Sequence, residues 1–436
     1  MITALQFVVA FVLVLAPLVF IHELGHFLAA KLFRIGVPVF SLGFGPRLFG
    51  FRRAETDYRI SAIPLGGYVR LTGDEADEHR VGAPEEFLSR PRWQRFIVYV
   101  AGATFNIFLA FGVMWFFFAY YGKVELPYPV VLDVVADSPA AIAGVERGDK
   151  LIEISGHNVQ DTRSFVYYHN LEIALAPNAD KEIVVERRGE LLTLRVNTGN
   201  DPEFGLGDPG WRIGREGESP VIARVLAGGA AEEAGLRPGD RIVGGDGIEA
   251  ITSLELQLLL ERSVGREIQL EVEREGQQVT LLVRPRASDE GRPIGVDFVP
   301  RRPTPLGLGA AAVESFQWNL DSSKILFVVL KRMVTTELPL KTMSGPMGIA
   351  QVARQALLQG PDTFLYLLGF FSLQLGILNL MPIPILDGGH IVILLIESVM
   401  RRNLSDAVKE RVMQAGLVFL LAFMSLIIIM DFSKIL

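Results

Sequence analysis

The stretch His22-Glu23-Leu24-Gly25-His26 interrupts a run of residues, 2–33, that is otherwise almost wholly apolar. An ionisable side chain in hydrocarbon costs roughly 2.5–3.5 kcal/mol on insertion scales, so such side chains usually serve a function. The same residues have the HExxH spacing that binds zinc from one helix, because positions i and i+4 share a face. The stretch therefore predicts a transmembrane helix that performs hydrolytic chemistry inside the bilayer.

Each residue of this motif has an expected role. His22 and His26 would hold one zinc ion, and Glu23 would take a proton from water as general base. The chain has only six histidines, so a chance HExxH is rare. The structural alternative is a pair of core histidines and a glutamate that hydrogen-bond across helices.

The composition narrows the class of protein. Half of the 436 residues are hydrophobic, and the net charge of -7 comes without a long basic run, which argues against nucleic acid as a partner. The absence of cysteine excludes thiolate zinc ligands, disulfides and a cysteine nucleophile. The first 33 residues lack the basic start and cleavage site of a signal peptide, so they predict a retained transmembrane helix.

Four apolar runs are long enough to cross a bilayer, for which about 20 residues suffice. They lie within residues 1–33, 93–121, 361–400 and 412–436. Pro382, Pro384 and the Asp387-Gly388-Gly389 sequence break the third run. The predicted fold is a multi-pass α-helical membrane protein with four transmembrane helices, a small membrane-associated β-sheet and two α+β domains outside the membrane.

Lysine and arginine concentrate in two loops, residues 34–92 and 401–411. Positively charged loops stay on the cytoplasmic side, so both should be cytoplasmic. Both termini and the long segment 122–360 should then face the opposite side. Within the first loop, the glycines and short alternating segments of residues 36–72 predict a small β-sheet, which either pairs with an extended substrate or only caps the membrane domain.

Two stretches, 138–152 and 229–243, match at an offset of 91 residues and share an AG(V/L)xxGD(K/R) element. This pattern resembles circularly permuted bacterial PDZ domains, placed here at residues 122–200 and 210–300. Such domains bind peptide C-termini by strand addition, at edges near Pro129-Val130-Val131 and Ile213-Gly214, or act only as a size filter. Residues 301–360 predict either an amphipathic helix on the membrane surface or a packed connecting helix.

A catalytic zinc site needs a third protein ligand and one open position. Asp387, in the broken third span, is the acid at that depth, and its charge would partly neutralise the dication. His390 is the competing third ligand. Asn379 could hydrogen-bond the scissile carbonyl or the substrate backbone, and Asn106 lies in a small-residue segment of the second span. For both asparagines the alternative is an interhelical hydrogen bond.

Taken together, the chain resembles the site-2 protease family of intramembrane zinc metalloproteases. His22-Glu23-Leu24-Gly25-His26 matches the family's HExxH, Leu386-Asp387-Gly388 its LDG element, and Asn379 and Pro382 its NxxPxxxxDG pattern. Ala103 departs from the family, whose members often have proline there. The resemblance implies one zinc ion per chain and a role in substrate binding for Asn379, Asn106 and Pro382.

The resemblance also implies a biological role. Relatives in the bacterial inner membrane make the second cut in single-span proteins such as anti-sigma factors, during the envelope stress response, and degrade remnant signal peptides. The PDZ domains and both termini would then be periplasmic. Two other functions compete with this one: a PDZ scaffold in the lipid bilayer that has lost catalysis, and a transporter with a broken helix.

Overall fold

The computed structural model describes residues 2–74, 82–123, 129–160, 162–201, 205–215, 219–249, 251–287, 293–298, 304–339, 342–343 and 345–435. The chain divides into two compact units. The first comprises Met1–Gly122, Pro305–Lys331 and Leu340–Leu436, and the second Lys123–Thr304 and Arg332–Pro339. The HExxH motif and the predicted spans all belong to the first unit.

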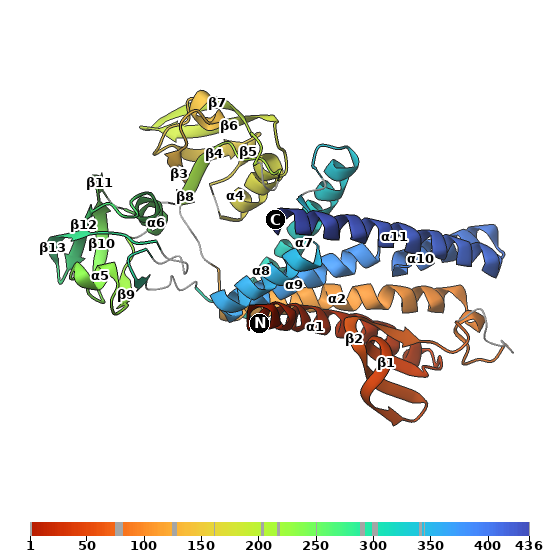
Figure 1. Ribbon diagram of the computed structural model, residues 1–436. Coiled ribbons are helices and arrows are strands. Elements are labelled where there is room, and N and C mark those ends of the chain that lie inside the picture. The colour runs from red at the N-terminus through yellow and green to blue at the C-terminus, as the bar shows by residue number, and fades with distance from the viewer. Residues whose placement is uncertain are drawn as a thin grey trace. The chain divides into compact units, whose positions relative to one another are not determined.

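The first unit is mainly helical. Its helices are α1 (Ile2–Leu32), α2 (Arg92–Tyr120), α7 (Leu308–Val334), α8 (Pro346–Gln359), α9 (Pro361–Asn379), α10 (Asp387–Met400) and α11 (Asp406–Ile435), with a 3-10 turn η1 (Phe87–Ser89). Helices α1, α2 and α9 run side by side (Figure 1). Among the described residues, four helices are long and apolar enough to cross a membrane: α1, α2, α9 and α11. The structure thus has the four apolar helices of the predicted membrane protein, and the broken third run forms α9 and α10.

Small residues let α1, α2 and α9 approach each other closely. A Cβ added to Gly25 of α1 would lie 2.5 Å from the carbonyl oxygen of Ala101 in α2. One added to Gly376 of α9 would lie 2.9 Å from the carbonyl oxygen of Ala103. Close backbone packing of this kind is a main source of helix association in membranes. It places the motif of α1 directly against α2.

A small antiparallel sheet lies beside α1. Its strands are β1 (Val39–Arg53) and β2 (Thr56–Arg70). Residues 39–42 pair with both 57–60 and 67–70, so β2 folds back along β1. Gly67 of β2 is so near α1 that an added Cβ would lie 3.0 Å from Glu23 Cγ. The sheet therefore forms one wall beside the HExxH motif.

The connecting helix α7 packs on α2 through its first turns. Trp115 Nε1 donates to the carbonyl oxygen of Leu308 at 2.9 Å, and Ser315 Oγ donates to that of Phe111 at 2.8 Å. Phe316 and other apolar side chains of α7 are exposed. The helix thus packs on α2 and also exposes apolar side chains, and its position on the membrane surface stays a prediction.

The second unit contains the two sequence repeats, each with its own core. The first repeat forms a sheet of order β7-β6-β4-β3-β8, with β5 paired to β4, and the second forms sheets β11-β10-β12-β13 and β14-β9. The first has β3 (Pro129–Val134), α3 (Pro139–Ile142), β4 (Lys150–Ile154), β5 (His157–Asn158), α4 (Thr162–His169), a π-helical turn η2 (Asn170–Ala174), β6 (Asp180–Arg187), β7 (Glu190–Asn197) and β8 (Trp211–Arg215). The second has β9 (Ile222–Val225), α5 (Ala230–Glu233), β10 (Arg241–Gly245), β11 (Ile248–Glu249), α6 (Ser253–Arg262), β12 (Ile268–Arg274), β13 (Gln277–Val283) and β14 (Val296–Phe298).

Each repeat contains its own ion pair between a buried aspartate and an arginine, and the two pairs are of the same kind. In the first, the Arg187 guanidinium donates to both carboxylate oxygens of Asp149 at 2.7 Å. In the second, Arg274 donates to both oxygens of Asp240 at 2.8 and 2.7 Å. Each aspartate belongs to the Gly-Asp element of its repeat, so the repeated sequence builds the same turn twice.

Candidate metal centre

The HExxH residues lie on α1 where the helix meets α2. His26 Nδ1 hydrogen-bonds to the carbonyl oxygen of Val98 at 2.7 Å. A carbonyl can only accept, so Nδ1 carries the hydrogen and Nε2 is left with a free lone pair. A hydrogen-bond acceptor at the ring nitrogen that does not bind the metal holds the imidazole in the orientation that metal binding needs. Gly102 lies against both histidines, and an added Cβ there would collide with the His26 ring.

Asp387 reaches the same place from the other end of the chain. It is the first residue of α10, directly after a tight turn that follows α9. Within that turn the amide of Ile383 donates to the carbonyl oxygen of Met381 at 2.7 Å, and Ile385 has a φ of 81°. That φ is strained for a β-branched residue, and strain of this kind concentrates at functional sites. Added Cβ atoms at Gly388 and Gly389 would meet carbonyl oxygens of the turn, so both positions require glycine.

The three donor groups have the spacing of a metal site. His22 Nε2 lies 3.2 Å from His26 Nε2 and 3.3 Å from Asp387 Oδ2, and His26 Nε2 lies 3.4 Å from Asp387 Oδ1. A tetrahedral zinc ion with bonds of about 2.0–2.2 Å holds its ligand atoms roughly 3.3–3.6 Å apart. Asp387 Oδ2 is also buried without a hydrogen-bond partner. Two imidazole nitrogens and one carboxylate group at this spacing fit zinc, with each histidine nearest to a different oxygen of Asp387.

Two asparagines face the outer nitrogen of His22. Asn106 Nδ2 and Asn379 Nδ2 each lie 3.4 Å from His22 Nδ1. Asn106 Oδ1 is buried without a partner. Because amide oxygen and nitrogen are assigned from the hydrogen-bond network, a flipped Asn106 would aim its oxygen at His22 Nδ1–H and satisfy both groups. The structure thus places both asparagines next to His22 Nδ1, on the side of the imidazole that faces away from the other two donor groups.

Glu23 points into a cavity between α1 and the β-sheet. Its side chain is almost fully buried, and the backbone amide of Val69 in β2 hydrogen-bonds its carboxylate. The cavity has a volume of about 810 Å³. Its lining includes the triad, Glu23, Asn379 and residues 66–69 of β2. Pro382 lies in the turn before Asp387 and does not belong to this lining.

His390, the alternative third ligand, lies one turn further along α10. Its ring stacks on Tyr99 with centroids 4.9 Å apart and an interplanar angle of 12°. Among the described residues, the group of donors within 4.8 Å of one another holds His22, His26 and Asp387 without His390. Sequence reasoning did not single out Tyr99 or Val98. A phenol in an apolar span was a usable signal for Tyr99, but Val98 acts through its backbone carbonyl, which any residue provides.

Comparisons with known proteins identify the family of the chain. The model of peptidase family M50 matches residues 10–423. The chain is 30% identical to regulator of sigma-E protease RseP of Escherichia coli, with 98% of both chains covered. It is also 30% identical to a Neisseria meningitidis protein whose name describes a zinc metalloprotease, with 98% and 99% covered. The chain therefore belongs to peptidase family M50, the site-2 protease family of zinc-dependent metalloproteases.

Proposed function

We propose that this chain is an intramembrane zinc endopeptidase in which His22, His26 and Asp387 hold the zinc ion and Glu23 transfers protons. The observation that carries the proposal is the set of donor separations of 3.2, 3.3 and 3.4 Å, built from two helices of the membrane-spanning unit. Zinc, when bound, polarises a carbonyl and lowers the pKa of water.

The chain's own residues supply the remaining chemistry. Glu23 accepts a proton from the attacking water and later passes it to the amide nitrogen of the leaving segment, so that one carboxylate serves both steps. Its burial against β2 keeps bulk water from competing for that proton. Asn106, behind His22, holds the imidazole in place. Asn379 lies near enough to help orient His22 or to donate to the scissile carbonyl.

A substrate helix must unwind before it can be cut, because a helix hides its carbonyl groups. We propose that the unwound strand lies along residues 66–69 of β2, which line the cavity next to Glu23. Main-chain hydrogen bonds to a sheet edge would hold it extended without requiring a particular sequence. Pro382 contributes indirectly, since it helps end α9 before the turn that presents Asp387.

The repeats of the second unit are proposed to be tandem PDZ domains. In the first, β8 is an edge strand, and a cavity of about 370 Å³ lies beside it with Phe165, His169 and Trp211 in its lining. Burial lowers the pKa of His169 to about 4, so the His169 imidazole stays neutral above pH 5. An extended segment with an apolar side chain fits such a groove, and exclusion of bulky substrates is the other role it could serve.

The name of the E. coli relative suggests the pathway. We propose that this chain acts in the bacterial inner membrane, with the repeats and both termini in the periplasm. Its substrates would be single-span proteins whose outer part has already been removed, such as anti-sigma factors, and remnant signal peptides. A catalytically inactive scaffold would need no donor triad with Glu23 beside it.

The test is metal analysis of the purified chain together with cleavage of a single-span model substrate. We expect one zinc ion per chain, and we expect Glu23→Gln to keep that zinc while losing cleavage by at least a thousandfold. Asp387→Ala should lose the zinc itself. Cleavage that survives Glu23→Gln would refute the mechanism, and full zinc occupancy in Asp387→Ala would move the third ligand to another residue, with His390 the first to examine.

A further inference from the structure

The metal centre is assembled from two halves that are anchored to different elements. The histidines are fixed to α2, by the carbonyl oxygen of Val98 and by the close packing of Gly102. Asp387 is fixed to the turn after α9, because the two glycines that follow it pack on carbonyl oxygens of that turn. The position of α10 against α2 therefore decides where the carboxylate lies relative to the two imidazoles.

One oxygen of the Asp387 carboxylate accepts no hydrogen bond from the described residues. This oxygen, Oδ2, lies 3.3 Å from His22 Nε2 and is buried. Carboxylates that bind a metal are usually fixed by hydrogen bonds from neighbouring groups. A functional site must be held within about 0.5 Å of its productive geometry. The placement of α10 must therefore supply precision that hydrogen bonds to this oxygen do not.

A stacked pair of rings joins α10 to α2 beside the metal centre. His390 of α10 lies on Tyr99 of α2, with ring centroids 4.9 Å apart and an interplanar angle of 12°. Tyr99 directly follows Val98, whose carbonyl oxygen orients His26. His390 comes three residues after Asp387, and residues at this spacing share a face of a helix. The stack thus links the neighbour of one ligand's anchor to the residue one turn away from another ligand.

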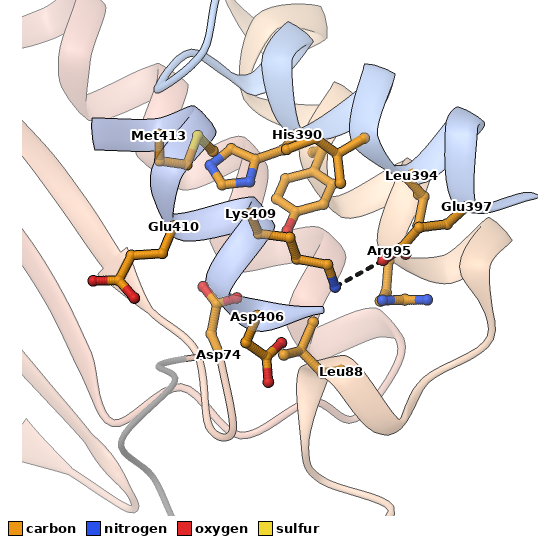
Figure 2. Close-up of a pocket in the computed structure, with 12 residues that line it drawn as sticks. Asp74, Leu88, Arg95, His390, Leu394, Glu397, Asp406, Lys409, Glu410 and Met413 are labelled. Atoms are coloured by element: carbon orange, nitrogen blue, oxygen red, sulfur yellow. Dashed lines mark ion pairs between the residues drawn. The ribbon is translucent and has the colours of Figure 1, made fainter. Parts of the chain in front are cut away.

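The other end of α10 is anchored by a buried acid. Glu397 accepts a hydrogen bond from the amide of Leu404 at 3.0 Å and pairs with the Lys409 ammonium of α11 at 2.7 Å. His390 and Glu397 are seven residues apart, two turns along one face of α10. Both line the cavity of Figure 2, in which a dashed line marks the Lys409–Glu397 pair. Helix α10 is therefore held by charge near its C-terminal end and by ring stacking near the metal centre.

We propose that the Tyr99–His390 stack sets Asp387 against the two histidines of the HExxH motif, so that Tyr99 and His390 are positioning residues of the metal centre. This inference rests on the ligand set of the proposed function. Aromatic pairs prefer offset-stacked or edge-to-face geometries, so a stacked pair fixes both the distance and the tilt between the helices that carry it. The role requires a flat ring at each position, and the nitrogens of His390 and the hydroxyl of Tyr99 take no part in it.

The experiment compares variants that keep a ring with variants that keep only apolar bulk, in the full-length chain in nanodiscs. Zinc affinity is measured by competition with a chelator, and the geometry of the site by the visible absorption spectrum of Co²⁺ bound in place of zinc. We expect His390→Leu and Tyr99→Leu to weaken zinc affinity roughly 3–10-fold, the factor that a stacked pair contributes, and to change the Co²⁺ spectrum. His390→Phe and Tyr99→Phe should bind zinc within about twofold of the wild type and keep its spectrum, because each retains a ring that stacks.

A second stack on α2 provides the matched control. Phe116 stacks on Tyr120 with ring centroids 5.5 Å apart and an interplanar angle of 7°, and both rings are exposed and lie outside the lining of the cavity that holds the triad. Phe116→Leu should therefore leave zinc affinity and the Co²⁺ spectrum as in the wild type. A loss there equal to that of His390→Leu would mean that any lost ring on α2 weakens the site, which overturns the proposal.

Two further results would overturn it. One is wild-type affinity and spectrum in both leucine variants. The other is a His390→Phe variant that behaves like His390→Leu, which would assign the role to an imidazole nitrogen. Asp387→Ala, measured alongside, tests the ligand set separately. Zinc bound there at wild-type affinity refutes the proposed function, whereas loss of zinc there, with unchanged leucine variants, refutes the positioning role alone.

Discussion

The metal centre depends on a residue that has no side chain. Gly102 of α2 packs against the rings of His22 and His26, and no Cβ fits between them. We expect Gly102→Ala to displace both rings and to weaken zinc affinity by about 10–100-fold, the usual range for disturbed supporting contacts. Competition with a chelator of known affinity measures the change.

A second glycine of the same helix provides the control. An added Cβ at Gly112 would have no neighbour within 4 Å, so Gly112→Ala should bind zinc as the wild type does. Comparing the Gly102→Ala and Gly112→Ala variants separates a steric effect at the metal centre from a general effect of alanine on α2. Equal affinities in the two variants would show that the histidines can move aside without loss of the metal.

At the scale of elements, the Asp–Arg pair of each repeat joins the Gly-Asp turn to a strand. Burial alone would raise the pKa of Asp240, but the hydrogen bonds and charge of Arg274 lower it overall. A lowered pKa in the folded state means that the pair stabilises the fold above the ordinary pKa of an aspartate. That stability is lost as the pH falls through the folded-state pKa.

We therefore expect Asp240→Asn to destabilise the second repeat at pH 7 by about 2 kcal/mol, since it removes a charged partner from Arg274. Hydrogen exchange of the full chain would show faster exchange in β10 and β12. The first repeat, with its own Asp149–Arg187 pair, is the internal control and should be unaffected. Exchange in β10 and β12 at the wild-type rate would mean that the Asp240–Arg274 pair contributes little to stability.

A second element-scale contact ties α8 to α11. The carboxylate of Asp431 accepts hydrogen bonds from the amides of Gly345 at 3.0 Å and Gly348 at 3.4 Å, at the first turn of α8. A negative charge there also compensates the positive end of the helix dipole. The apolar helix α11 thus carries a buried acid because that acid satisfies another helix.

At the scale of the whole molecule, the lysine and arginine distribution predicts a periplasmic position for the repeats. The chain has no cysteine, so single cysteines can be introduced without a background signal. In intact spheroplasts, a membrane-impermeant maleimide should label a cysteine at Gly189, in the turn between β6 and β7. It should not label one at Asn403, between α10 and α11. The opposite pattern would invert the topology.

Much of this protein could be predicted from sequence by itself. Local patterns suffice for the HExxH motif, the four apolar runs, the Gly-Asp repeats and the break before Asp387, because hydrophobic length, helical period and proline act over short stretches. The same patterns pointed to Asp387 as a third donor, although 361 residues separate it from His26.

Only the tertiary structure decided how these parts meet. The carbonyl of Val98 that fixes His26, the packing of Gly102 against the rings and the cavity beside Glu23 all arise where separate elements pack together. None of them has a sequence signal, because a backbone carbonyl, a missing Cβ and an empty volume depend on neighbours far along the chain. The chemistry of the donors is local in the sequence, whereas their 3.2–3.4 Å spacing is a property of packing.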